Sequence, residues 1–147
     1  GAGVRKDDVS EVNKLIAALR DFVGTDNGAN LLAAYKRGAN ILRIEEKKDG
    51  KSFAADAVQD GLLKEQAEKD LAAALTPVAA KVKDLFAKED FTGCMAALAE
   101  LRAPVDAFFE KIMVNAPEAD IRANRLSLLS RLRDTMNTIA DFSKIEG

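Results

Sequence analysis

The chain has 147 residues, of which 48% are apolar, 31% charged and 5% aromatic, and this size and composition fit one globular domain. Its 22 Lys and Arg against 24 Asp and Glu give a net charge of -2, which argues against a wholly basic nucleic-acid coat and against an acidic disordered tail. The chain has no His, the commonest general acid and base, and lacks the P-loop, Rossmann, HExxH and CxxC motifs. We therefore expect it not to be a self-sufficient enzyme.

The start of the chain and its single cysteine indicate a domain cut from a longer, cytoplasmic protein. Residues 1–3, Gly-Ala-Gly, are interpreted as a cloning remnant, and residues 4–147 as one domain. Cys94 lies in an apolar stretch, so we expect a buried core residue rather than a reactive thiol. No apolar run approaches the roughly 18 to 20 residues of a membrane span. Neither a metal site nor a membrane partner is expected.

Apolar residues recur at spacings of three and four along the whole chain, which predicts an all-α fold without strands. Five helices are expected, at about residues 8–23, 28–46, 61–88, 91–114 and 117–142. Short connections between such helices favour an up-and-down bundle. The turn-rich segment 47–52 is expected to be the longest loop.

Two prolines fall inside the expected helices. Pro77 is predicted to kink or break the helix at 61–88, because proline lacks the backbone donor and crowds the preceding turn. Pro104 is predicted to interrupt the next helix and to stand in the first turn of its continuation to Val114. Each interruption is expected within about two residues of its proline.

The helix at 28–46 carries a positively charged face. Lys36, Arg37, Asn40 and Arg43 share one side of it, and no acidic residue occurs between Asn30 and Ile44. Unneutralised cations suit phosphates, and an Asn side chain can read a base edge through its paired donor and acceptor. The alternative is a solvated basic face without a ligand.

The helix at 117–142 contains four arginines and no acid between Ile121 and Arg133. Arg122 flanks its apolar stripe, whereas Arg125 falls inside the stripe. A buried charge needs a partner, so we predict a structural ion pair of Arg125 with Asp106, which lies on the preceding helix. Direct contact of Arg125 with RNA is the alternative.

Several stretches together resemble one known family. Residues 34–42, AYKRGANIL, resemble the RxxNIL helix of DALR-type anticodon-binding domains. Residues 101–114, LRAPVDAFFEKIMV, with RANRLSLL at 122–129 and ADFS at 140–143, resemble the C-terminal end of bacterial glycyl-tRNA synthetase β subunits. Gly38 departs from the pattern, where a larger residue is expected, and suggests close helix packing.

The resemblance implies a DALR-like helical bundle that binds the anticodon end of glycine tRNA. The domain would be a non-catalytic part of an ATP-dependent glycine-tRNA ligase whose α subunit uses ATP and Mg, and no cofactor is expected here. The rest of the β subunit and the α subunit would be its partners. Candidate RNA-binding residues are Lys36, Arg37, Asn40, Arg43, Asn115 and Arg122. Tyr35 is a candidate for stacking on a base.

Two other functions remain open at this point. A structural helical bundle could mediate subunit or domain contacts, with its basic faces meeting acidic protein surfaces. A DALR domain from another aminoacyl-tRNA synthetase is the second alternative, because only the resemblance of residues 101–114 indicates glycine.

Overall fold

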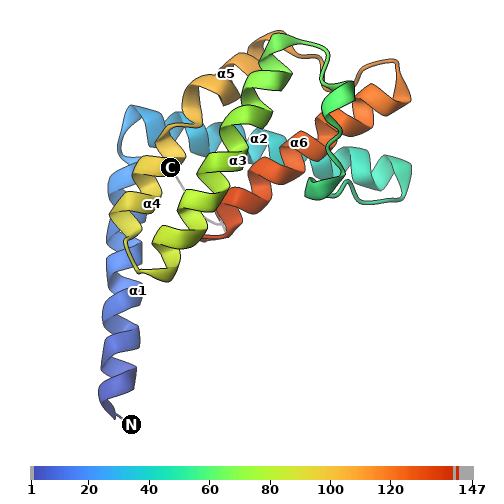
Figure 1. The fold of residues 1–147 in the computed structure, drawn as a ribbon. Coiled ribbons are helices and arrows are strands. Elements are labelled where there is room, and N and C mark those ends of the chain that lie inside the picture. The colour runs from blue at the N-terminus through green and yellow to red at the C-terminus, as the bar shows by residue number, and fades with distance from the viewer. Residues whose placement is uncertain (1, 141, 143–147) are drawn as a thin grey trace.

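The computed structural model describes residues 2–140 and 142, with the side chains of 13–140 and 142. These residues form helices and turns without a β-strand, which confirms the all-α prediction. Six α-helices and two 3-10 turns follow in the order α1 (Ala2–Val23), α2 (Asp26–Asp49), η1 (Ala55–Ala57), η2 (Asp60–Leu62), α3 (Gln66–Ala87), α4 (Phe91–Ala99), α5 (Arg102–Lys111) and α6 (Ala119–Asn137) (Figure 1). In the described part of the chain, no helix combines the length and apolar character that a membrane span requires.

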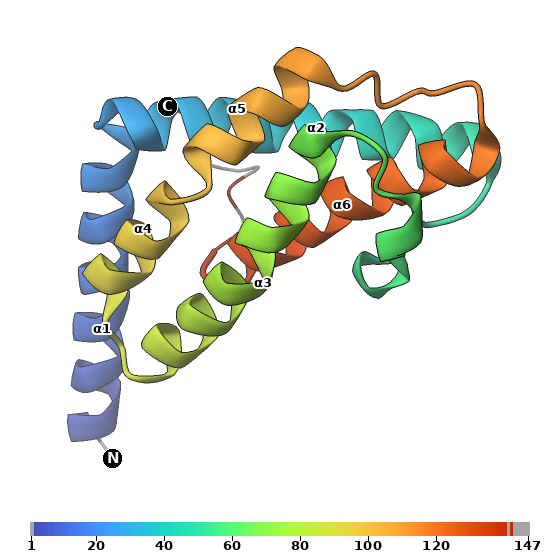
Figure 2. The same cartoon turned by 45° about the horizontal axis from the view of Figure 1, so that its top comes forward.

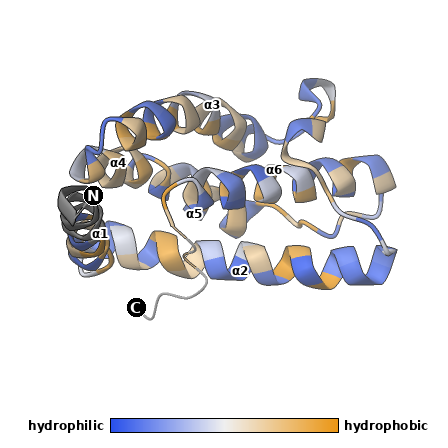
Figure 3. Cartoon of the chain, turned by 90° about the horizontal axis from the view of Figure 1, so that it is seen from below, coloured by the Kyte–Doolittle hydropathy of each residue, from blue (hydrophilic) through white to orange (hydrophobic). Residues whose placement is uncertain are grey.

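The helices pack in layers. Both α5 and α6 contact α2 on one side and α3 on the other (Figures 2 and 3). Helix α1 turns away from the start of α2 and contacts α4, and its first turns extend beyond the other helices (Figure 1). This arrangement leaves the side of α2 that faces away from α6 open to solvent.

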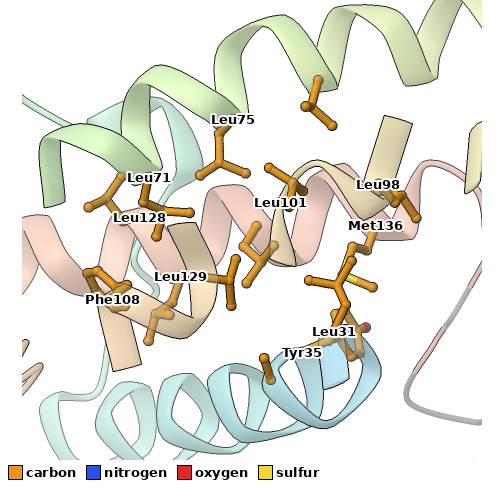
Figure 4. Close-up of a cluster of buried hydrophobic side chains, with 14 of the residues drawn as sticks. Leu31, Tyr35, Leu71, Leu75, Leu98, Leu101, Phe108, Leu128, Leu129 and Met136 are labelled. Atoms are coloured by element: carbon orange, nitrogen blue, oxygen red, sulfur yellow. The ribbon is translucent and has the colours of Figure 1, made fainter. Parts of the chain in front are cut away.

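The core lies where α2, α3, α5 and α6 meet. Leu71 and Leu75 of α3 point toward Leu128 of α6, and Leu31 of α2 closes the cluster from the opposite layer (Figure 4). Tyr35 is only 3% exposed, and its hydroxyl donates to Oδ1 of Asn137 at 2.7 Å. The prediction that Tyr35 stacks on a base is therefore wrong, because its ring belongs to the core.

Two glycines permit close approaches of α2 to its neighbours. A Cβ at Gly28 would lie 1.7 Å from the carbonyl oxygen of Phe22, so only glycine fits the corner between α1 and α2. Thr25 closes this corner by accepting the Gly28 N–H at 3.0 Å. Gly38 is buried, and a Cβ there would lie 3.4 Å from Leu129 of α6, in agreement with the close helix packing expected at this position.

Helix α1 begins at Ala2 rather than near residue 8, and the expected boundaries also differ around the connection between α2 and α3. Helix α2 continues through residues 47–49 and ends at Gly50, whose φ of 68° is the left-handed conformation that glycine favours. The loop is longer than expected, because α3 begins at Gln66 rather than near Gly61. Asn124 of α6 holds this loop by accepting the Gln59 N–H at 2.6 Å and donating to the Gln59 carbonyl at 3.2 Å.

The two prolines behave differently. Helix α3 runs through Pro77, so a break at that position is wrong. The fourth expected helix is interrupted at Glu100 and Leu101, slightly earlier than expected, and Pro104 stands in the first turn of α5 as predicted. That position tolerates proline because the first-turn N–H groups have no partner within the helix. The last helix is shorter than expected and ends at Asn137.

Candidate nucleic-acid interface

Four polar residues of α2 form one exposed line, called here the basic row. They recur at spacings of four, three and four, which places them on the same side of the helix: Lys36, Asn40, Arg43 and Lys47. Nη2 of Arg43 donates to Oδ1 of Asn40 at 2.7 Å, so these two side chains are held together on the surface. Asn40 is exposed and, among the described residues, hydrogen bonds within its own helix rather than linking two helices. Lys47 lies beyond the helix that the sequence predicts at 28–46, because the segment 47–52 has the composition of a turn.

The acidic residues near the end of α2 do not neutralise the basic row. Glu46 accepts the Phe53 N–H through Oε2 at 3.0 Å, and its Oε1 lies 4.0 Å from Nη1 of Arg133. Glu45 and Asp49 both bind Arg122 of α6. These three carboxylates thus face the loop and α6, and among the described residues no carboxylate pairs with the basic row on the opposite side of α2.

Arg122 joins the end of α2 to the start of α6. Its Nη2 lies 2.7 Å from Oε1 of Glu45, its Nη1 lies 2.7 Å from Oδ2 of Asp49, and its Nε donates to Oδ1 of Asn115 at 2.9 Å. The Asp49 and Glu45 carboxylates raise the pKa of Arg122, and the hydrogen bond from Arg122 lowers the pKa of Asp49. The guanidinium is engaged within the fold, so this geometry gives no support to the predicted contact of Arg122 with RNA.

Arg37 and Asn115 lie beside the basic row rather than on it. Both line a pocket of about 330 Å3 between α2 and the segment that follows α5. The guanidinium carbon of Arg37 lies 4.8 Å from the ring centroid of Phe109, a cation-π contact that holds Arg37 against α5. Asn115 is exposed in the segment between α5 and α6. The structure therefore brings five of the six candidate residues onto one side of the molecule, as the basic row and the adjoining pocket.

Arg125 is buried and bonded to a carboxylate as predicted, but the expected partner is wrong. Its Nη2 lies 3.0 Å from Oε1 of Glu68 on α3, and its Nη1 donates to the Met113 carbonyl at 2.6 Å. Asp106 is exposed on the outer side of α5 and lies 3.4 Å from Nε of Arg102, one turn away. The sequence could have indicated Glu68 as a buried residue, because it shares a helix face with Leu71 and Leu75.

The titratable groups show no arrangement suited to a metal ion in the part of the chain that the structure describes. Cys94 is buried as predicted, and burial raises the pKa of its thiol. A thiol that is harder to ionise is a poorer nucleophile. Besides Lys47, two exposed apolar side chains at the pocket, Ile44 and Met113, are absent from the residues that the sequence predicts for the site.

Comparisons with known proteins identify relatives of this chain. The family model of the DALR anticodon binding domain matches residues 31–146. The glycine-tRNA ligase beta subunit of Rhodospirillum centenum is 56% identical over 142 residues, which are 97% of this chain and 20% of that protein. The glycine-tRNA ligase beta subunit of Phenylobacterium zucineum is 43% identical over 141 residues, which are 96% of this chain and 21% of that protein. The chain thus spans about a fifth of the length of these relatives.

Proposed function

Because this chain belongs to the DALR anticodon-binding domain family, we propose that it binds the anticodon end of glycine tRNA within a glycine-tRNA ligase β subunit. The observation that carries the proposal is the exposed basic row, whose positive charge the neighbouring carboxylates leave unpaired because they bind α6 and the loop. Lys36 and Arg43 would contact phosphates, and Asn40 would contact a base edge.

In this proposal the chain positions the tRNA and does not perform the chemistry. A separate α subunit would use ATP and Mg to activate glycine and to charge the tRNA, in the cytoplasm. The remainder of the β subunit would be the second protein partner. A groove of about 330 Å3 between α1 and α4, lined by the apolar side chains of Phe22 and Met95, suits a contact with protein. This groove supports the other candidate function, a helical module for subunit contacts.

The proposal is tested by titrating the chain with a hairpin RNA that carries the glycine anticodon stem and loop. Lys36→Ala and Arg43→Ala should weaken binding of every RNA, and each should reduce the slope of log affinity against log salt by about 0.7, the value for one lost phosphate contact on a single strand. Asn40→Ala should instead reduce the preference for the glycine anticodon, by roughly 1 to 3 kcal/mol if the amide makes a bidentate base contact.

Lys83→Ala provides a matched control, since it removes one exposed lysine from α3, away from the basic row. Its binding curve and salt slope should equal those of the parent chain. Variants at Lys36, Asn40 and Arg43 that all bind like the parent would show that the RNA surface lies elsewhere. An absence of RNA binding by the parent chain would favour the module for subunit contacts.

A further inference from the structure

The groove between α1 and α4 lies at one end of the molecule, where these two helices run side by side (Figures 1 and 2). Its buried lining residues are Phe22 and Met95, which are each 6% exposed and belong to the core. The other apolar side chains that line it are short, namely those of Ala18, Ala96 and Ala99. Short side chains beside a buried apolar floor leave a concave apolar surface of the kind that binds a partner.

The groove is already formed in the isolated chain, because α1 is held at a fixed angle to α2. Thr25 accepts the Gly28 N–H at 3.0 Å and donates its hydroxyl to the Phe22 carbonyl at 2.6 Å. Gly28 lies so close to the Phe22 carbonyl that no other residue fits there. Phe22 and Thr25 both line the groove. A partner therefore meets a preorganised surface, which lowers the entropic cost of binding.

A second hollow of about 280 Å3 continues the groove beside the start of α4 and carries negative charge. The two hollows share Asp21 and Thr92, and the second adds the carboxylates of Glu89 and Asp90 and one cation, Lys14. Among the residues that the structure describes, Asp21 has no salt-bridge partner. Three carboxylates against one ammonium attract a cationic side chain and repel a phosphate backbone, so a basic protein segment suits this groove better than RNA does.

The extent of the family match indicates where such a segment comes from. Helix α1 precedes residues 31–146, which the DALR model matches, whereas the match to the Rhodospirillum centenum β subunit covers nearly the whole chain and so includes most of α1. The groove thus lies where a helix outside the family match meets the DALR bundle. About four fifths of that β subunit lies outside the match. A segment of the same polypeptide is tethered to this domain and so reaches the groove at a high effective concentration.

We propose that the α1–α4 groove holds an amphipathic helix of the β subunit from outside these 147 residues. Its apolar face would lie over Phe22 and Met95, and a Lys or Arg side chain would lie beside Asp21 and Asp90. A helix laid with its apolar face in a groove is a recurring mode of recognition between protein segments. The inference rests on the proposed placement of the chain within a β subunit and does not require that the chain bind RNA.

The test uses the complete β subunit that carries this chain, purified together with the α subunit. Thr92 is exposed and shared by both hollows, and it is replaced by the photo-cross-linking amino acid p-benzoylphenylalanine. After irradiation, mass spectrometry should find position 92 joined to a β-subunit peptide outside these 147 residues that carries Lys or Arg beside apolar residues. The same replacement at Lys83, which is exposed on α3 and lines neither hollow, is the matched control and should not give this product.

Two variants of the cross-linkable subunit test the charge and the shape of the groove. Asp21→Lys places a like charge beside the incoming Lys or Arg and should lower the yield of the product at least about 5-fold. Ala96→Trp fills the groove and should lower the yield by steric exclusion. Both replaced side chains are exposed, so the core stays intact. Asp60→Lys, the same charge reversal at an exposed aspartate of η2, should leave the yield unchanged.

Several outcomes would overturn the inference. These are a cross-link from position 92 to the α subunit, to a second copy of this chain or to RNA, and the absence of any product. A product whose yield is the same in Asp21→Lys and in Ala96→Trp as in the parent would place the segment outside the groove and overturn it as well.

The proposed function is tested separately, because the groove lies at the start of α2 and the basic row lies at residues 36–47. The chain with Asp21→Lys or Ala96→Trp should bind the anticodon hairpin like the parent chain. Hairpin binding without the cross-link would overturn this inference and leave the proposed function standing. The cross-link without hairpin binding would leave the inference standing and overturn RNA binding.

Discussion

Nη1 of Arg122 lies 2.7 Å from Oδ2 of Asp49, although 73 residues separate them in the chain. The bond ties the last turn of α2 to the first turn of α6, and it keeps the Asp49 carboxylate away from the basic row. The pair lies at the end of α2, in a segment with the composition of a turn, and its Asp49 carboxylate lies on the side of α2 opposite the basic row.

Acid should weaken this contact. The pKa of Asp49 lies below its ordinary value of 3.8 in the folded chain, so the stabilisation is complete above pH 3.8 and is lost as the pH falls through the lowered folded pKa. Asp49→Asn should therefore lower the Tm at pH 7, and its Tm should approach that of the parent chain when both are melted below pH 3.8. The exposed Asp60→Asn serves as the control and should follow the parent at both pH values. A Tm difference between Asp49→Asn and the parent chain that stays constant from pH 7 to below pH 3 would contradict this expectation.

The buried pair of Glu68 and Arg125 should contribute far more to stability than the exposed pair of Arg102 and Asp106. Glu68 is fully buried, so Glu68→Ala leaves the Arg125 charge without its carboxylate and should cost about 3 to 5 kcal/mol of unfolding free energy. Asp106→Ala removes a solvent-exposed pair within one helix and should cost less than about 0.5 kcal/mol. Urea unfolding of both variants measures the two losses of unfolding free energy. Equal losses would show that burial does not determine how much each ion pair contributes to stability.

The helical period predicted the fold class and most of the exposed basic row, because both follow from which residues share one face of one helix. The same reasoning does not tell which helix lies opposite a given face. Arg125 was assigned to Asp106 on the neighbouring helix in sequence, but α3 packs against α6 and supplies Glu68. The pocket could not be predicted from the sequence for the same reason, because its walls come from α2, α5 and the segment after α5.

Predictions from local composition also fail where tertiary contacts determine the structure. The Lys-rich segment ending in Asp49 and Gly50 has the composition of a turn, yet it is the last turn of α2, and its Asp49 side chain is bonded to α6. The sequence predicts Arg122 as an RNA contact because its cationic character is visible there, whereas its three partners lie on α2 and on the segment before α6.

Asn124 should control the order of the loop between α2 and α3. Asn124→Ala removes both side-chain bonds to the Gln59 backbone, so the loop should open more often, at a cost of roughly 1 to 3 kcal/mol. Amide hydrogen exchange should show faster exchange at Gln59 and unchanged protection in the middle of α3. Equal exchange at Gln59 in the variant and the parent would mean that the loop is held by other contacts.

The chain by itself should neither activate glycine with ATP nor transfer it to tRNA. It has no His and no phosphate-binding loop, so nothing in it is expected to align ATP and a metal ion for attack. Glycine-dependent pyrophosphate exchange with the purified chain should stay at background. Activity that rises in proportion to the chain's concentration and survives further purification would contradict the division of labour proposed here.

Recognition of the anticodon end of glycine tRNA is the function proposed for this domain. The most direct measurement is the Kd of the chain for full-length glycine tRNA and for the same tRNA with its anticodon replaced, each at two salt concentrations. We expect glycine tRNA to bind more tightly by about tenfold or more at both salt concentrations, and both affinities to fall as salt rises. Equal affinity for the two tRNAs, or binding that does not respond to salt, would contradict it.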